Sequence, residues 1–201
     1  MTADDTPTGL PSDVRLDGLG IVLREWTADD LPVMVELFDD PQVDHWTPLR
    51  SPFDLAAAHA YLDKAHHHRV EGRCLQLAIT TDGYEPKGEI LLARTGDHGL
   101  GAELAYAVGP RHRRQRLATR AVRLITTYAY GVLAMEQVIL RIARHNQPST
   151  AVARSAGFEL TDSEPITREG SLHLLHTWRH SSGVLAAADT TSSRPGGRSD
   201  Q

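Results

Sequence analysis

The chain has 201 residues and a formal net charge of −5 at pH 7, with 23% charged and 40% hydrophobic residues. This length suits one well-buried domain, and the acidic balance gives no reason to expect nucleic acid binding. No apolar run approaches membrane-spanning length, and the N-terminus is acidic where a signal peptide would be basic. We therefore expect a cytoplasmic protein without a membrane partner.

Both ends of the chain are polar and rich in small residues, which is typical of disordered tails. We expect such tails at residues 1–13 and 181–201, and one domain over residues 14–180. The lone cysteine, Cys74, lies in an alternating apolar run and is expected to be a buried structural thiol. Three consecutive histidines at 66–68 would point in different directions on a helix, so we expect no metal site there or elsewhere.

The apolar periodicity predicts a mixed α/β domain. Expected strands lie at 19–25, 74–80, 89–94, 101–108, 137–143, 158–160 and 171–179. Four helices are expected. The first begins after an N-cap at Thr27 and stops before Pro41, the second starts at 51 or 54 and runs to 70, the third starts at 117 and ends near 131, and the fourth runs from 146 to 157. Glycine turns between the middle strands indicate an antiparallel meander. The long helix between the strands at 101–108 and 137–143 makes a right-handed parallel crossover the default.

Between the first two helices lies D-P-Q-V-D-H-W-T-P, which we interpret as a loop bracketed by prolines. An aromatic residue in such a loop either covers a pocket or plugs the core. Both interpretations of Trp46 are open on the sequence alone.

The most informative stretch runs from Glu103 to Thr119, where a strand ends, Gly109-Pro110 interrupts it, and an arginine-rich loop leads into a helix. A helix start offers unpaired N–H groups and the positive end of a dipole, which suit a phosphate. The cluster Arg111, Arg113, Arg114 and Arg116 runs against the acidic background and indicates a local anionic ligand.

Five stretches, in order along the chain, resemble the GNAT family of N-acetyltransferases, and within it the branch of ribosomal-protein N-terminal alanine and serine acetyltransferases. They are L-R-E-W-T-A-D-D-L, D-D-P-Q-V-D-H-W, A-E-L-A-Y-A-V, R-R-Q-R-L-A-T-R-A-V and N-Q-P-S-T-A-V-A-R-S-A-G-F. The resemblance implies an α/β (α+β) acyl-CoA N-acyltransferase fold. Its sheet would be mixed and mostly antiparallel, with six to seven strands, about four flanking helices and splayed central parallel strands.

The resemblance also implies acetyl-CoA, or another acyl-CoA, as co-substrate and no metal. The family's loop reads Arg/Gln-x-x-Gly-x-Gly/Ala, and in this branch often Arg-Gly-x-Gly-x-Ala. Arg113 matches the first position and Ala118 the last, but both glycine positions of the branch form hold arginine, Arg114 and Arg116. We expect helical torsions in this loop, with N–H groups facing the phosphates and the added guanidinium groups reaching phosphate oxygens. The implied cofactor residues are Ala107, Val108, Arg113, Arg114, Gln115, Arg116, Leu117, Ala118, Thr119 and Asn146.

For the chemistry, the resemblance makes Glu103 the candidate base for the amine proton, with Asp44 as a weaker alternative. The ordinary role of Glu103 would be that of an exposed strand residue or of a salt-bridge partner. The position of the family's tyrosine acid holds Ala153, so Ser149 is the candidate proton donor, although first-turn hydrogen bonding would equally explain it. Asn146 could likewise serve only as a helix cap.

An N–H group near Val108 is the expected oxyanion donor. His45 and Trp46 match the family's loop on the acceptor side and are the candidate substrate contacts. The expected acceptor is a primary amine, either a small molecule or a protein N-terminus, and the protein would be a monomer or homodimer. The alternative interpretation is a non-catalytic domain that binds acyl-CoA.

Overall fold

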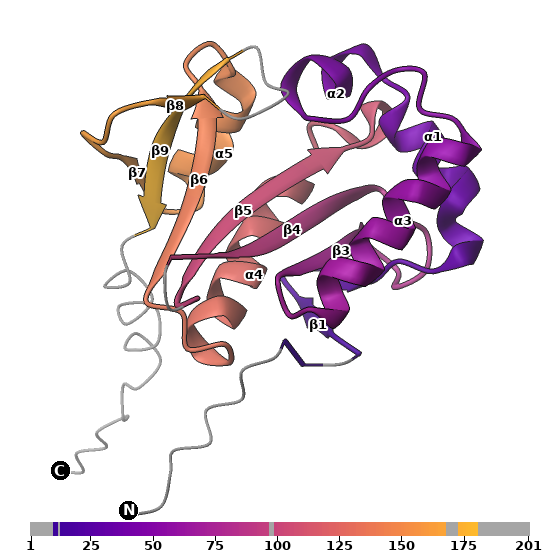
Figure 1. Ribbon diagram of the computed structural model, residues 1–201, viewed down its shortest axis with the longest axis horizontal. Helices are drawn as coiled ribbons and strands as arrows, with labels where there is room; N and C mark the ends of the chain where they lie inside the picture. Colours follow the sequence, from indigo (N-terminus) through magenta and orange to yellow (C-terminus); the bar gives the residue numbers. More distant parts are fainter. Residues whose placement is uncertain (1–9, 12, 97–98, 168–172, 181–201) are drawn as a thin grey trace, which may run out of the picture.

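The computed structural model describes residues 10–11, 13–96, 99–167 and 173–180. They form a mixed sheet of nine strands in the order β1-β2-β3-β4-β5-β6-β9-β7, with β8 paired to β9 (Figure 1). The strands are β1 Arg15–Gly18, β2 Ile21–Glu25, β3 Cys74–Thr80, β4 Gly88–Thr95, β5 Gly101–Val108, β6 Gln137–Ala143, β7 Phe158–Leu160, β8 Ile166–Thr167 and β9 Leu174–His180. Every pairing is antiparallel except that of β5 with β6.

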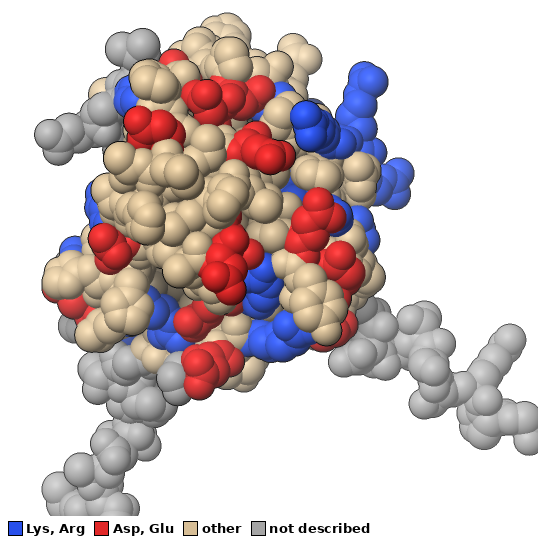
Figure 2. All heavy atoms as spheres, turned by 90° about the vertical axis from the view of Figure 1, so that its right-hand side faces the viewer, with Lys and Arg blue, Asp and Glu red and all other residues tan. Residues whose placement is uncertain are grey.

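Helices cover both faces of this sheet. They are α1 Leu31–Phe38, α2 Pro41–Trp46, α3 Leu55–Val70, α4 Leu117–Gly131 and α5 Gln147–Ser155, with short 3-10 turns η1 Ala28–Asp30 and η2 Pro110–His112. One core joins α4 and α5 to one face of the sheet, and a second core lies under α1, α2 and α3. The face formed by α1 and α3 carries interspersed acidic and basic side chains (Figure 2). None of the described helices is long and apolar enough to cross a membrane.

The expected α/β fold with its mostly antiparallel sheet is confirmed, with nine strands instead of six or seven and five α-helices instead of about four. The first strand was placed too early, because Leu19 and Gly20 form the turn of a β1–β2 hairpin with φ of 55° and 69°. Such positive φ values at both turn residues match the twist of the flanking strands. The expected tails at 1–13 and 181–201 lie outside the described residues, apart from residues 10, 11 and 13, and so does the predicted strand start at 171.

The prediction of a loop between the first two helices is wrong for its central part, which forms helix α2. Asp40 is its N-cap: its Oδ1 accepts hydrogen bonds from the Gln42 and Val43 amides at 3.0 and 3.2 Å. Pro41 occupies the first helical turn, where its missing N–H is of no consequence. An N-cap followed by proline is therefore a helix start here, although the same letters also suit a turn.

The two parallel strands part after a short contact. β5 and β6 are paired from Gly101 with Gln137 to Leu104 with Leu140, and the register then ends. The remainder of β5, from Ala105 to Val108, keeps its antiparallel partner β4 but has no partner in β6. Figure 1 shows the two strands diverging toward the side where α2 and α5 lie. The expected splay of the central parallel strands is confirmed.

The second core contains a carboxyl group. Glu89 on β4 is 2% exposed and accepts hydrogen bonds from the Tyr61 hydroxyl and the Gln76 amide, each at 2.7 Å. Burial raises the pKa of Glu89 to about 7, and the two hydrogen bonds only partly offset this effect. Cys74, at the start of β3, is buried as expected, and burial raises the pKa of its thiol to about 12.

Candidate functional site

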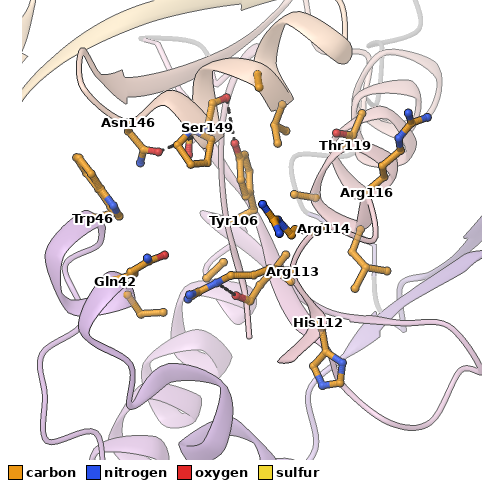
Figure 3. A pocket seen from close by; sticks show the side chains of 18 of the residues that line it. Gln42, Trp46, Tyr106, His112, Arg113, Arg114, Arg116, Thr119, Asn146 and Ser149 are labelled. Atoms are coloured by element: carbon orange, nitrogen blue, oxygen red, sulfur yellow. Dashed lines mark hydrogen bonds between the residues drawn. The ribbon is translucent and has the colours of Figure 1, made fainter. Parts of the chain in front are cut away.

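A cavity of ≈ 680 Å³ opens where β5 and β6 part. Its walls come from the end of β5, the loop after η2, the first turn of α4, helix α5 and helix α2 (Figure 3). The lining residues are Gln42, Val43, Trp46, Thr47, Tyr106, Ala107, Val108, Pro110, His112, Arg113, Arg114, Arg116, Leu117, Ala118, Thr119, Asn146, Pro148, Ser149, Ala151, Val152 and Ser155. The residues that the family resemblance implies for cofactor binding all line this cavity, with the exception of Gln115.

The start of α4 faces this cavity. Leu117 is buried and anchors the helix in the core, while Ala118 and Thr119 line the cavity. No acidic residue occurs in the first turn of α4 to neutralise its positive end. Unpaired N–H groups at a helix start and the dipole together favour an anion.

Arg114 and Arg116 have left-handed backbone torsions, with φ of 65° and 57°. The expectation of ordinary helical torsions in this loop is therefore wrong. Arg113 before these two residues is extended, and Arg116 directly precedes the right-handed residues of α4. A left-handed residue followed by a right-handed one turns successive N–H groups toward one point, which makes a concave seat for an anion. The same torsions cost an L-residue other than glycine about 1–2 kcal/mol, because the Cβ crowds the carbonyl oxygen. The loop thus keeps a glycine-like backbone while carrying arginine side chains.

Arg113 reaches the cavity wall, but its guanidinium group is held by protein atoms. Its Nη2 donates to Asp40 Oδ1 at 2.6 Å and its Nε donates to the Val108 carbonyl at 3.2 Å. Burial raises the pKa of Asp40, but hydrogen bonds from Arg113 and from the α2 amides outweigh burial and hold that pKa below its usual value. Arg113 therefore ties the cofactor loop to the N-cap of α2.

The start of α5 lies across the cavity from this loop. Asn146 caps the helix, since its Oδ1 accepts from the Ser149 amide at 3.1 Å. Figure 3 shows the amide nitrogen of Asn146 turned away from Ser149. The cap and a contact with a ligand are therefore compatible. The Tyr106 hydroxyl donates to the Ser149 carbonyl at 3.3 Å, and burial raises the pKa of Tyr106 to about 12.

A second cavity of ≈ 130 Å³ adjoins the first. The two share the wall residues Trp46, Thr47, Tyr106, Asn146 and Ser149. The smaller one also contains Glu103, whose side chain is 14% exposed and whose Oε2 lies 3.4 Å from Arg141 Nε. The candidate base is thus both a salt-bridge partner and a wall residue of a chamber next to the larger cavity.

Trp46 lies in the wall of both cavities, which favours the interpretation of a pocket cover. Its ring packs between neighbours, with ring centroids 4.3 Å from His45 and 5.0 Å from His173. His45 itself is exposed and lies outside both cavity walls. Asp44, the weaker base candidate, also lines neither cavity and has Arg50 Nη1 3.8 Å from its Oδ1.

Sequence reasoning missed several wall residues. Tyr106 lies within a strand that was predicted, but no motif gave it a role. Gln42 and Thr47 were hidden because the segment around them was interpreted as a loop. His112 was missed because it lies in the three-residue turn η2, which is too short to show a periodic pattern in the sequence. Within the described ranges, no group of three or more His, Cys, Asp or Glu is placed to hold a metal ion.

The family described as "Acetyltransferase (GNAT) domain" matches residues 21–159. Among curated proteins, the Bacillus licheniformis protein named "Uncharacterized N-acetyltransferase p20" is 21% identical over 140 residues, which is 69% of this chain and 79% of that protein.

Two solved structures share the fold. The Mycobacterium smegmatis protein RimJ, solved in complex with CoA-disulfide, superposes with a TM-score of 0.73 and 17% identity, over 86% of this chain and 88% of that one. A ribosomal-protein-S5-alanine acetyltransferase from Vibrio fischeri superposes with a TM-score of 0.69 and 13% identity, over 83% and 95% of the two chains.

Proposed function

This chain belongs to the GNAT acetyltransferase family and is an N-acetyltransferase, and we propose that it transfers the acetyl group of acetyl-CoA to a primary amine in the cytoplasm. The observation that carries the assignment of residues is the meeting of two cavities at the parted strands. The larger has an anion seat at the start of α4, and the smaller has a carboxylate. The two therefore suit a phosphorylated thioester and an amine, respectively.

The donor would occupy the larger cavity. The loop at 113–119 and the start of α4 hold its phosphates, since N–H groups and arginine side chains converge there. The pantetheine arm lies along β5 from Ala105 to Val108, where the backbone has no partner in β6. Asn146 contributes its side-chain amide from the opposite wall. Bound there, acetyl-CoA supplies an activated thioester carbonyl.

The acceptor amine would enter from the smaller cavity, beneath Trp46. Glu103 accepts the proton that the amine loses as its nitrogen bonds to the carbonyl carbon. A backbone N–H near Val108 stabilises the negative charge on the carbonyl oxygen. The carbon–sulfur bond then breaks, and the Ser149 hydroxyl, at the junction of the two cavities, gives its proton to the departing sulfur. Ser149 regains a proton from solvent, to which Glu103 releases the proton of the amine. No metal ion takes part in this proposal.

The acceptor is a small amine or a protein N-terminus, since the smaller cavity accommodates only the reacting end. An acidic protein of net charge −5 also suits a cationic amine, and it makes a nucleic acid acceptor unsuitable. We propose that the chain works as a monomer or homodimer without a membrane partner.

The test has two steps. Thermal shift is first measured with acetyl-CoA and with CoA, and both are expected to raise the unfolding midpoint. Release of free thiol is then followed over a panel of small amines and short peptides with free N-termini. Turnover of one class identifies the acceptor. Binding without turnover across the panel favours the non-catalytic interpretation, and absence of binding overturns the assignment of the cavity.

A further inference from the structure

Arg114 and Arg116 differ from the other arginines around the site, because their side chains have no partner among the described residues. In the part of the chain that the structure describes, neither side chain takes part in a hydrogen bond or an ion pair, and both residues are exposed. Their neighbours differ: Arg113 is held by Asp40, and Arg120 donates to the Gln115 carbonyl at 3.1 Å. Both residues nevertheless line the larger cavity.

The backbone at these two positions adds a second observation. The left-handed torsions already form the anion seat, and glycine would adopt them without strain. Compared with glycine, arginine at these two positions destabilises the folded protein, because its Cβ is strained by the left-handed torsions. Strain that persists next to a cavity is a reason to look for a compensating role of the side chain.

The two side chains lie at different places. Figure 3 shows Arg114 turned toward the middle of the cavity, near Tyr106, and Arg116 beside Thr119, directed away from Tyr106. A diphosphate seated on the start of α4 would have Arg114 on its inner side. Arg116 would then meet whatever anionic group extends beyond the diphosphate.

We propose that Arg114 binds the diphosphate of the cofactor and that Arg116 binds its 3′-phosphate, so that the pair makes this site selective for CoA over dephospho-CoA. The inference rests on the proposed function, because it needs acyl-CoA in the larger cavity. It goes further by assigning cofactor selectivity to two side chains whose backbone positions favour glycine. A doubly charged monoester is the natural partner of an otherwise unpaired guanidinium group.

The test compares Arg114→Gly, Arg116→Gly and the control Arg111→Ala. Arg111 lies in the same loop region and loses the same charge, but it is outside both cavity walls, and its Nη1 lies 3.9 Å from Glu36 Oε2. Calorimetric dissociation constants are measured for CoA and for dephospho-CoA. Unfolding midpoints without ligand are expected not to fall in the two glycine variants, since glycine fits the torsions. Loss of affinity in a folded variant then reports on the side chain.

The unchanged protein is expected to bind CoA about tenfold or more tightly than dephospho-CoA, the equivalent of one charge-assisted contact. Arg116→Gly should remove this preference, Arg114→Gly should weaken both ligands by a similar factor, and Arg111→Ala should change neither. A preference that survives in Arg116→Gly overturns the inference, as does an equal loss in Arg111→Ala. Failure of the unchanged protein to bind either ligand overturns the proposed function instead.

Discussion

Glu89 makes the stability of the protein depend on pH in an unusual direction. Its carboxyl pKa is raised to about 7 in the folded protein from an ordinary value of 4.5. Below pH 4.5 the group is protonated in both states and carries no penalty. As pH rises toward 7, the unfolded chain ionises first, so the free energy of unfolding falls by at most about 3 kcal/mol.

Glu89→Gln should therefore abolish this loss. The glutamine oxygen can still accept from Tyr61, and Gln76 can turn its own amide to accept from the new one. Urea unfolding at pH 5, 6, 7 and 8 is expected to show wild type losing stability relative to the variant across this window. Glu159→Gln is the control, because Glu159 is exposed on β7. If the free energies of unfolding of wild type and Glu89→Gln change with pH in parallel, the raised pKa of Glu89 is contradicted.

Glu103 offers a prediction on activity. Glu103→Gln keeps the size of the side chain but cannot take a proton, so kcat should fall by about 100-fold or more, as for loss of a general base. The dissociation constant of acetyl-CoA should stay unchanged, since Glu103 lies in the smaller cavity only. Thiol release and calorimetry measure the two. Asp44→Asn, outside both cavities, should leave kcat near wild type; equal effects of the two variants would argue against Glu103.

At the level of secondary-structure elements, the ion pair between Asp40 and Arg113 joins helix α2 to the loop at 113–119. Asp40→Asn keeps a side chain that caps helices well but removes the charge that holds Arg113. It should lower the free energy of unfolding by about 1–2 kcal/mol, the value of a hydrogen bond between charged groups. Asp40→Ala also removes the cap and should cost about 1 kcal/mol more. Urea unfolding of the two variants measures the difference, and identical values would mean that the cap contributes nothing.

Long elements were predictable because each contains a sustained pattern of buried apolar residues. This holds for β3, β4, β5, β6 and α4, whose predicted limits lie close to those observed. The β1–β2 turn at Leu19 and helix α2 were missed because each depends on a few local contacts. A leucine with positive φ gives no turn signal, and the Asp40 cap resembles an ordinary loop residue until Arg113 is placed beside it.

Some features of the candidate site could likewise be predicted from the sequence, and others could not. The loop at 113–119 was predictable from its charge and its place between strand and helix. The torsions of Arg114 were not, because left-handed backbone is expected of glycine and the side chain suggests otherwise. The pairing of Glu103 with Arg141 depends on the register of two strands that are distant in sequence. Tyr106 gained a role only once the splay had brought it opposite α5.

Across the whole molecule, the sheet is continuous except where β5 leaves β6. Acetyl-CoA is therefore expected to slow amide hydrogen exchange at Ala105–Val108 as well as in the loop at 113–119. Adenosine 3′,5′-bisphosphate has the nucleotide but lacks the pantetheine arm, so it should protect at most the loop and leave Ala105–Val108 unchanged. Hydrogen exchange followed by mass spectrometry distinguishes the two, and equal protection of β5 by both ligands would exclude an arm that lies along this strand.

The parted strands also have a consequence for the life of the protein in a cell. If a metabolite completes the sheet, each tenfold rise of its free concentration above the dissociation constant adds about 1.4 kcal/mol to the folded state. Proteases that act on transiently opened chains would then remove this protein faster when acyl-CoA is scarce. The amount of enzyme, and not only its rate, would follow the nutritional state of the organism.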